Sequence, residues 1–322
     1  MGALEAIHRR KAVDGFRHST TMKLTLARRR ILWAYAFLSV SLLFFIVIRW
    51  YPTLLAFNIS FRDWNVFQNN GAWVGLENYQ DIWRDLFKPR SAVRSAFINT
   101  LQYVIIGVPM QLVVGLLIAM MLNSITRAAG FFRAAYFIPF VTSAVAVAFV
   151  WNWLYAPQSG LINQMLNSVG LPMQPFTKSP QQALLSVTVV AVWSSLGFTI
   201  IIFLAGLQQV PEIFYEAARI DGASRWQIFW RITLPLLNPV IVYLAVLQTI
   251  AFLRMFDLVQ NMSDLGDGGP LKSTTTVVLE VYKEGFGSYN MGYAGALTVI
   301  LFFLILAITV FQLRVLQRRV EY

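Results

Sequence analysis

The side chains that usually carry enzyme or metal chemistry are scarce in this sequence. It contains no cysteine, which excludes disulfides, thiolate metal sites and cysteine nucleophiles. Its two histidines, His8 and His18, lie in a charged N-terminal stretch, so no histidine centre can form among the apolar segments. No G-x-x-x-x-G-K-[ST] sequence occurs, so the usual loop for cradling nucleotide phosphates is missing. We therefore predict no catalytic residue, no metal site and no cofactor of the chain's own.

Three aspartates near residue 260 are the strongest candidates for a cation site. Asp257, Asp264 and Asp267 lie in and beside a glycine-rich segment. Calcium loops place their oxygen ligands at regular positions, and the irregular spacing here fits no such pattern. The sequence therefore does not predict a calcium site.

Two groups of polar and aromatic side chains lie inside long apolar segments, where polar groups are costly and usually functional. The first group is Trp193, Ser194, Ser195 and Phe198, and the second is Gln248, Phe252, Arg254 and Asp257. We interpret these eight residues as candidates for lining a solute path.

Each group also has a structural interpretation. Arg254 and Asp257, three apart on one predicted helix, could neutralise each other. The two serines of the first group could be small residues that let helices pack closely. Gln111 and Asn152 are weaker candidates, better explained by hydrogen bonds between helices.

The segment from Gln208 to Pro239 is too long for a simple connection. Pro211 suits the first turn of a helix that would run to about Asp221, and Gly222 suits the end of that helix. Ser224 with Gln227 three residues later has the form of a capping box that starts a second helix. The segment therefore predicts a helix, a sharp turn and another helix.

The residues around this turn are mainly small or charged. Small side chains keep it thin, and charges surround it. A thin, charged knob is shaped to enter a cleft on a soluble partner, whereas the alternative is an amphipathic helix lying on lipid. The small residues are Ala217, Ala218, Gly222 and Ala223, and the charged ones are Glu216, Arg219, Asp221 and Arg225.

The elements that must position these residues are membrane spans. The chain of 322 residues is 57% hydrophobic and 13% charged, and its apolar residues form blocks about 20 residues long, enough to cross a bilayer. We predict an all-α integral membrane protein with a basic tail at 1–30 and a transmembrane domain at 31–322. The predicted spans are 31–51, 98–122, 131–155, 183–207, 234–258 and 291–313, with a loop at 208–233.

Lysine and arginine indicate the orientation. With six spans, both termini and the 208–233 loop share a face that carries sixteen of these residues, while the opposite face carries eight. The richer face should be cytoplasmic. The net charge of +11 is thereby explained by cytoplasmic loops, and nucleic acid is not a predicted partner.

The loop also carries a family resemblance. Glu216-Ala217-Ala218, Asp221-Gly222-Ala223 and Leu234-Pro235 resemble the EAA loop of permease subunits in binding-protein-dependent ABC importers. Further segments resemble carbohydrate-uptake permeases of the maltose and glycerol-phosphate type, while the tail at 1–30 matches nothing and the first external loop lacks the maltose protein's inserted domain. These segments are Val74 to Tyr79, Asn99-Thr100, Phe132 to Tyr136 with Pro139, and Gly268-Gly269-Pro270 with Thr274, Thr275 and Thr276.

The resemblance implies a type I importer permease in the bacterial inner membrane. Its implied partners are a second permease, an ATPase dimer that binds ATP and Mg, and an extracytoplasmic solute-binding protein. The loop would dock in the ATPase through Glu216, Ala217, Ala218, Asp221, Gly222, Ala223 and Arg225. The implied substrate is a sugar, with monosaccharides, oligosaccharides, acidic fragments and glycerol phosphate all compatible.

A transporter driven by an ion gradient is the alternative. Such proteins usually have more spans and membrane-embedded acids for coupling. Asp257, near the end of a span, is the one clear candidate here.

Overall fold

The computed structural model describes residue 26 and residues 28–67, 71–124, 129–263 and 266–316. The chain divides after Asn58 into two units, which are taken in turn. The first unit contains most of a helix at Arg28–Ile59 that is long and apolar enough to cross a membrane. A π-helical stretch, η1 (Ile46–Trp50), leads into α2 (Tyr51–Ile59). The predicted span 31–51 lies within this helix, which starts earlier because arginine is a good helix former; most of the predicted tail lies outside the described residues.

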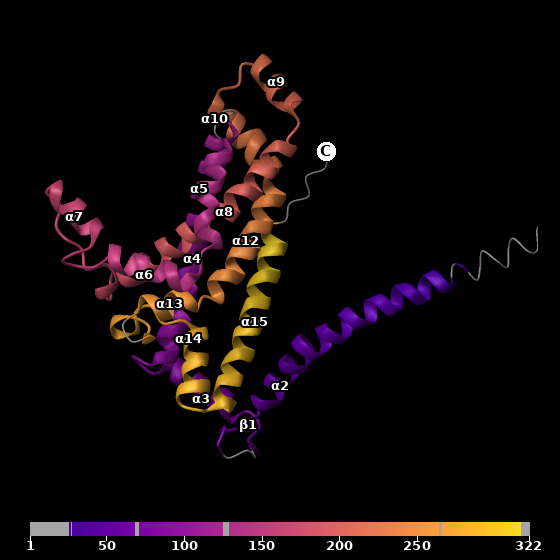
Figure 1. Ribbon diagram of the computed structural model, residues 1–322, viewed down its shortest axis with the longest axis vertical. Coiled ribbons are helices and arrows are strands. Elements are labelled where there is room, and N and C mark those ends of the chain that lie inside the picture. The colour runs from indigo at the N-terminus through magenta and orange to yellow at the C-terminus, as the bar shows by residue number, and fades with distance from the viewer. Residues whose placement is uncertain (1–25, 27, 68–70, 125–128, 264–265, 317–322) are drawn as a thin grey trace, which may run out of the picture. The chain divides into compact units, whose positions relative to one another are not determined.

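The second unit is built on four packed helices, α4 (Ala92–Asn123), α8 (Ala183–Gln209), α12 (Asn238–Leu253) and α15 (Met291–Leu316). Figure 1 shows α4, α8 and α12 side by side, with α15 against α12. Large side chains such as Tyr103, Phe203 and Leu244 are fully buried between them. Three of these helices, α4, α8 and α15, are individually long and apolar enough to span a membrane, as predicted.

The predicted spans 131–155 and 234–258 are not single helices. The first consists of α5 (Ala129–Val141) and α6 (Ala144–Leu154), which meet at an angle of 100°. The break has a local cause, because the Thr142 hydroxyl donates back to the Ile138 carbonyl and Ser143 adopts an extended backbone that starts α6. The part of the chain that the structure describes thus has four candidate spans, or six if each bent pair counts as one.

The second bent pair precedes α12. A helical stretch at Arg225–Leu236 meets Asn238–Leu253 at 66°. It is made of α10 (Arg225–Ile228), the π-helical η3 (Phe229–Thr233) and α11 (Leu234–Leu236). Pro235 and Pro239 lack the backbone N–H that would continue the helical ladder, which favours a bend here. Helix α12 ends at Leu253, five residues before the predicted end of the span.

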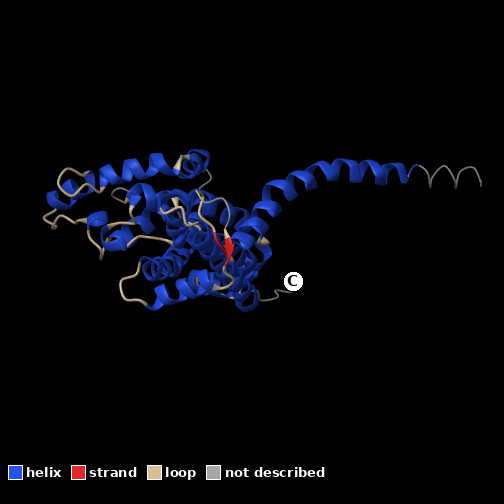
Figure 2. Cartoon of the chain, turned by 90° about the horizontal axis from the view of Figure 1, so that it is seen from below, coloured by secondary structure: helices blue, strands red, loops and turns tan. Residues whose placement is uncertain are grey.

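Short elements cap the bundle at the end that carries α3, called here the α3 end. Strands β1 (Arg62–Asp63) and β2 (Ala72–Trp73) form an antiparallel hairpin, seen among the helices in Figure 2, with Arg62 opposite Trp73. Helix α3 (Glu77–Phe87) packs on α4 and α15. The remaining short elements of this unit, which do not all lie at the α3 end, are α7 (Leu161–Ser168), η2 (Phe176–Lys178), α13 (Asp257–Met262), η5 (Pro270–Lys272), α14 (Val277–Tyr282) and η6 (Lys283–Gly287).

Candidate coupling elbow and polar pathway

The segment between α8 and α12 folds as the sequence predicts. Helix α9 runs over Glu212–Ile220 with Pro211 directly before it, and an ion pair of 2.8 Å joins Arg219 to Glu212. Figure 1 shows α9 and α10 at the opposite end of the second unit from α3. We call residues Glu216–Ala223, where the chain reverses, the elbow.

The turn of the elbow depends on a glycine. Gly222 has a φ of +75°, a left-handed conformation that other residues avoid. Its N–H donates to the Arg219 carbonyl, and the Ala223 N–H donates to the Ala218 carbonyl at 2.9 Å. These two bonds form a Schellman motif, which satisfies carbonyls at the end of α9. A Cβ atom added at Gly222 would meet no atom of the described residues within 4 Å, so this position faces open space.

The second helix begins with the predicted capping box. The Gln227 N–H donates to the Ser224 hydroxyl at 3.3 Å, and the Ser224 N–H donates to the Gln227 side-chain oxygen at 2.8 Å. The two donors are therefore satisfied within the loop itself. Because both helix ends at the turn are satisfied locally, the elbow is built to hold its shape at a surface.

The predicted elbow residues differ in exposure. Ala218 is buried and Ala223 is half-buried, which anchors the turn on its inner side. A hollow of about 350 Å³ lies beside the turn, lined in part by Ala218, Gly222 and Arg231. The outer surface therefore combines charge with small side chains. Its exposed members are Glu216, Ala217, Asp221, Gly222 and Arg225.

A buried hydrogen-bond network ties α4, α8 and α12 together. The Gln111 amide donates to the Thr199 hydroxyl at 2.7 Å, and the Gln248 amide donates to the same oxygen at 3.1 Å. The Ser195 hydroxyl donates to the Gln111 carbonyl oxygen at 3.0 Å. Gln111 and Thr199 are fully buried, so each bond replaces one to water. The network accounts for Ser195 and Gln248 as links between helices of this chain.

Phe252 also serves packing between helices. Its ring lies against Gly107 of α4, where a methyl group would come within 2.5 Å of the ring. Phe252 is 3% exposed, so it contributes little surface to any path.

The remaining candidates from α8 keep exposed surface. Trp193 is 39% exposed and makes an edge contact with Trp151 at 5.3 Å between ring centroids. Phe198 is partly exposed and stacks on Phe140 at 5.5 Å. Ser194 is partly exposed and donates to the Ala191 carbonyl of its own helix. These three side chains therefore keep two aromatic rings and a hydroxyl partly exposed along α8.

Arg254 and Asp257 do not share a helix, so that prediction was wrong. Helix α12 ends at Leu253, Arg254 adopts a non-helical backbone, and Asp257 opens α13. Both side chains are exposed, and no ion pair joins them among the described residues. The helix ends here because the Arg254 and Met255 N–H groups bond in a terminal turn.

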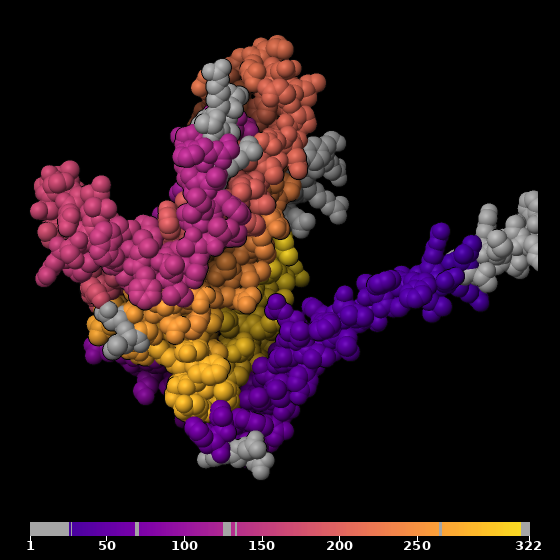
Figure 3. All heavy atoms as spheres, in the orientation of Figure 1, coloured from indigo at the N-terminus to yellow at the C-terminus, as the bar shows by residue number. Residues whose placement is uncertain are grey.

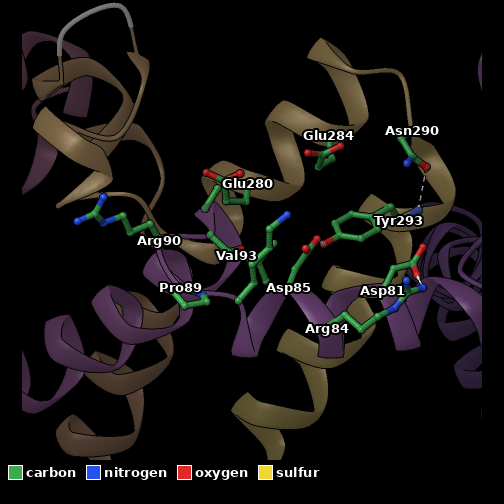
Figure 4. A pocket seen from close by; sticks show the side chains of 13 residues that line it. Asp81, Arg84, Asp85, Pro89, Arg90, Val93, Glu280, Glu284, Asn290 and Tyr293 are labelled. Atoms are coloured by element: carbon green, nitrogen blue, oxygen red, sulfur yellow. Dashed lines mark hydrogen bonds and ion pairs between the residues drawn. The ribbon is translucent and has the colours of Figure 1, made fainter.

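The α3 end holds a cavity of about 660 Å³ that sequence reasoning missed. Figure 4 shows the Asp85 carboxylate turned toward the Tyr293 hydroxyl, which donates to it at 2.9 Å. Glu280 is 3% exposed and accepts a bond from Thr275. The lining draws charged residues from α3, the connection between α3 and α4, α14 and η6. These are Asp81, Arg84, Asp85, Lys88, Arg90, Glu280 and Glu284.

Electrostatics in this cavity favour protonation of one carboxyl. Burial, followed by the nearby charge of Glu280, raises the pKa of Glu284 above its ordinary 4.5. In contrast, the hydrogen bond from Lys283 lowers the pKa of the Asp267 carboxyl. The surroundings of Glu284 therefore disfavour its negative charge, whereas Asp267 does not line the cavity.

Comparison with known proteins decides the family. Residues 87–322 match the family described as the inner membrane component of binding-protein-dependent transport systems. The chain belongs to this family. The match covers α4 to α15 and includes the elbow. Both the helix bundle and the elbow of this permease therefore lie within the region that the family model describes.

Curated relatives resemble this permease over nearly their whole length. A probable ABC transporter permease of Bacillus subtilis, YesP, is 31% identical over 92% of this chain and 94% of its own. The arabinooligosaccharides transport system permease AraP of Halalkalibacterium halodurans is 33% identical over 87% of this chain and 86% of its own. The sn-glycerol-3-phosphate transport permease UgpA of Agrobacterium fabrum is 29% identical over 89% and 96%.

Solved structures confirm the fold of this permease. A chain of a bacterial alginate ABC transporter, in complex with an alginate-bound periplasmic protein, superposes with a TM-score of 0.76. That alignment has 22% identity and covers 89% of this chain and 94% of the other. The predicted type I importer permease fold, with multiple helices in the membrane, is therefore confirmed.

Proposed function

We propose that this permease forms the translocation pathway of an ATP-driven sugar importer together with a second permease. The elbow carries the proposal, because its caps hold a thin, charged turn at the end of α9, where nothing in the described chain covers Gly222. Such a turn suits a groove on a soluble partner. That partner is an ATPase dimer, which would bind ATP and Mg on its own residues.

The positive charge distribution supports a cytoplasmic position for the elbow. The face predicted to carry both termini and the loop holds twice as many lysines and arginines as the other. In this orientation the α3 end faces outward. Its charged cavity then offers a soluble solute-binding protein a surface with charges of both signs.

A sugar is the substrate class best supported. Two relatives are named for arabinooligosaccharides and for glycerol 3-phosphate, and the solved neighbour imports alginate. In this chain, Trp193 and Phe198 offer rings for the apolar faces of a sugar, while Ser194 offers a hydroxyl. Arg254 and Asp257, exposed just beyond α12, supply charged groups for polar substituents.

The structure narrows the eight candidates for the path. Ser195, Gln248 and Phe252 have partners on neighbouring helices of the same chain. We therefore assign the path to the other five and expect substitutions at these three to act first on stability. This division can be tested within one helix, because α8 carries Ser195 from one set and Trp193, Ser194 and Phe198 from the other.

Uptake by proteoliposomes tests the energy source. We expect the reconstituted importer, with both permeases and the ATPase, to accumulate sugar with internal ATP and without an ion gradient. Glu216→Lys should reduce this uptake at unchanged membrane insertion, because it reverses an exposed charge of the elbow. Uptake that persists without the ATPase, driven by an ion gradient, would support the secondary transporter instead.

A substitution of Arg254 can show whether the importer takes up an acidic or a neutral sugar. An arginine facing the path would bind a carboxylate or phosphate through charge-assisted hydrogen bonds. We expect Arg254→Gln to lower uptake of an acidic sugar and to leave a neutral sugar unaffected. If the wild type and the Arg254→Gln variant take up an acidic sugar equally well, Arg254 does not bind the substrate.

A further inference from the structure

The helical stretch that follows the elbow carries three aromatic rings that contact one another. The ring centroids are 5.5 Å apart for Trp226 and Trp230, and 5.3 Å apart for Phe229 and Trp230. Phe229 packs partly against the helix bundle, whereas Trp226 is 69% and Trp230 49% exposed. We call these three residues the aromatic cluster. Two indole rings therefore stay outside the bundle, next to the start of the fifth predicted span.

Another side of this stretch lines the hollow beside the elbow. Ile228, Arg231 and Ile232 border the hollow, and none of the three rings does. Arg231 is exposed, and no ion pair involves it among the described residues. The sequence has no Asp or Glu between Asp221 and Asp257. The stretch therefore combines exposed rings on one side with an unpaired positive charge on another.

The bend before α12 sets the depth of this stretch in the membrane. The twelve residues Arg225–Leu236 meet α12 at 66°. At about 1.5 Å per residue the stretch is about 18 Å long, so with α12 along the membrane normal its depth changes by only about 7 Å. The headgroup layer outside the hydrocarbon core is roughly 5–8 Å thick. Since the predicted span begins at residue 234, the residues directly before it lie within this layer.

The headgroup layer suits both the rings and the arginine. Tryptophan is enriched at this depth, because its ring is apolar while its N–H stays near water. Arginine attracts the anionic headgroups of the cytoplasmic leaflet. A soluble partner at the elbow would cover the tip of the second unit, where Figure 3 shows α9, whereas α10 and η3 lead from the elbow to α12. Lipid is therefore the occupant that matches the depth, the rings and the charge together.

From these observations we infer that the aromatic cluster and Arg231 bind anionic lipid headgroups of the cytoplasmic leaflet. The loop thus serves two partners, because the elbow takes the soluble protein and the stretch after it takes lipid. The inference rests on the proposed function only for the choice of leaflet. A hydrogen bond of 3.3 Å between the Tyr215 and Thr233 hydroxyls joins α9 to η3, so the lipid contact would also hold the elbow at a fixed depth.

Photo-cross-linking in the assembled importer tests the lipid contact. The importer is reconstituted in vesicles of phosphatidylethanolamine and phosphatidylglycerol. Trp226→p-benzoylphenylalanine keeps a large aromatic side chain and should give lipid adducts. The same replacement at Ile228, which borders the hollow on the same helix, is the matched control and should give few. If the Trp226 variant forms adducts with protein alone, or no more lipid adducts than the Ile228 variant, the inference is wrong.

The composition of the lipid adducts tests the charge. One arginine near the membrane surface favours an anionic lipid about fivefold. Phosphatidylglycerol should therefore be enriched about fivefold over its bulk share in adducts of Trp230→p-benzoylphenylalanine. Adding Arg231→Gln should abolish this enrichment, whereas Arg231→Lys should retain it.

Two results would contradict a role for Arg231. The first is adducts in the bulk proportion while Arg231 is present, and the second is enrichment that survives Arg231→Gln. Neither readout depends on transport. Lipid adducts with this enrichment, in an importer that shows no ATP-driven uptake, would support the lipid contact and reject the proposed function.

Discussion

Two substitutions at Gly222 can separate the shape of the elbow from its fit to a partner. The glycine has a left-handed backbone, and a Cβ atom added there would lie more than 4 Å from every atom of the described residues. Gly222→Ala adds one methyl group and places an ordinary residue in a conformation that costs roughly 1–2 kcal/mol. Gly222→Asn costs less in the backbone, because asparagine tolerates this region, but it adds a larger side chain.

The order of the two variants is the expected result. If the elbow is thin because it enters a groove, the added side chain overpacks the contact by about 1–3 kcal/mol. That cost corresponds to roughly 5- to 150-fold weaker coupling for Gly222→Asn. The alanine variant, with the smaller side chain, should then be the more active of the two despite its backbone strain.

The assay is ATP hydrolysis stimulated by the binding protein, together with uptake, in proteoliposomes of the whole importer. Membrane insertion and co-purification of the ATPase are measured alongside. If Gly222→Asn retains wild-type activity and Gly222→Ala loses it, the glycine serves only the turn and our reasoning about thinness is refuted. Full activity of both variants would refute a coupling role for the elbow.

Three further substitutions test the packing and the charged cavity. Thr199→Val should destabilise the protein by about 1–3 kcal/mol, since two glutamine amides lose their acceptor; Thr298→Val, whose hydroxyl bonds within its own helix, should have a smaller effect on thermal unfolding. Gly107→Ala should cost about 1–3 kcal/mol, and Phe252→Leu should recover part of the loss in the double variant; additive losses would contradict a direct contact. Glu284→Gln should stabilise the protein at neutral pH, because a raised carboxyl pKa means that ionisation opposes folding, and the gain should vanish as pH falls toward 4.5; a gain independent of pH would exclude this cause.

The elbow was predictable because its signals are local. Pro211, Gly222 and the pair Ser224 and Gln227 act within a few residues, and each lies where the caps and the turn require it. The long spans were equally accessible, because the apolar runs of α4, α8 and α15 need no knowledge of their neighbours.

The polar centre and the bends depend on contacts that are distant in sequence. Gln111 and Thr199 are 88 residues apart, so no local pattern pairs them. The break at Thr142 and Ser143 involves residues that are common in continuous membrane helices. Asp85 and Tyr293 are separated by 208 residues, and only the fold brings them to one cavity.

The continuity of α8 makes it a lever between the two faces of the membrane. At 27 residues it is about 40 Å long, and it ends two residues before α9 begins. The bonds of Thr199 to α4 and α12 clamp it near its middle, so the three helices should tilt as one body and not slide past one another. A tilt of about 10° would displace the far end of a rod of this length by roughly 7 Å. Under the proposed function, a push at the elbow would reach the opposite face as a tilt of the three helices together.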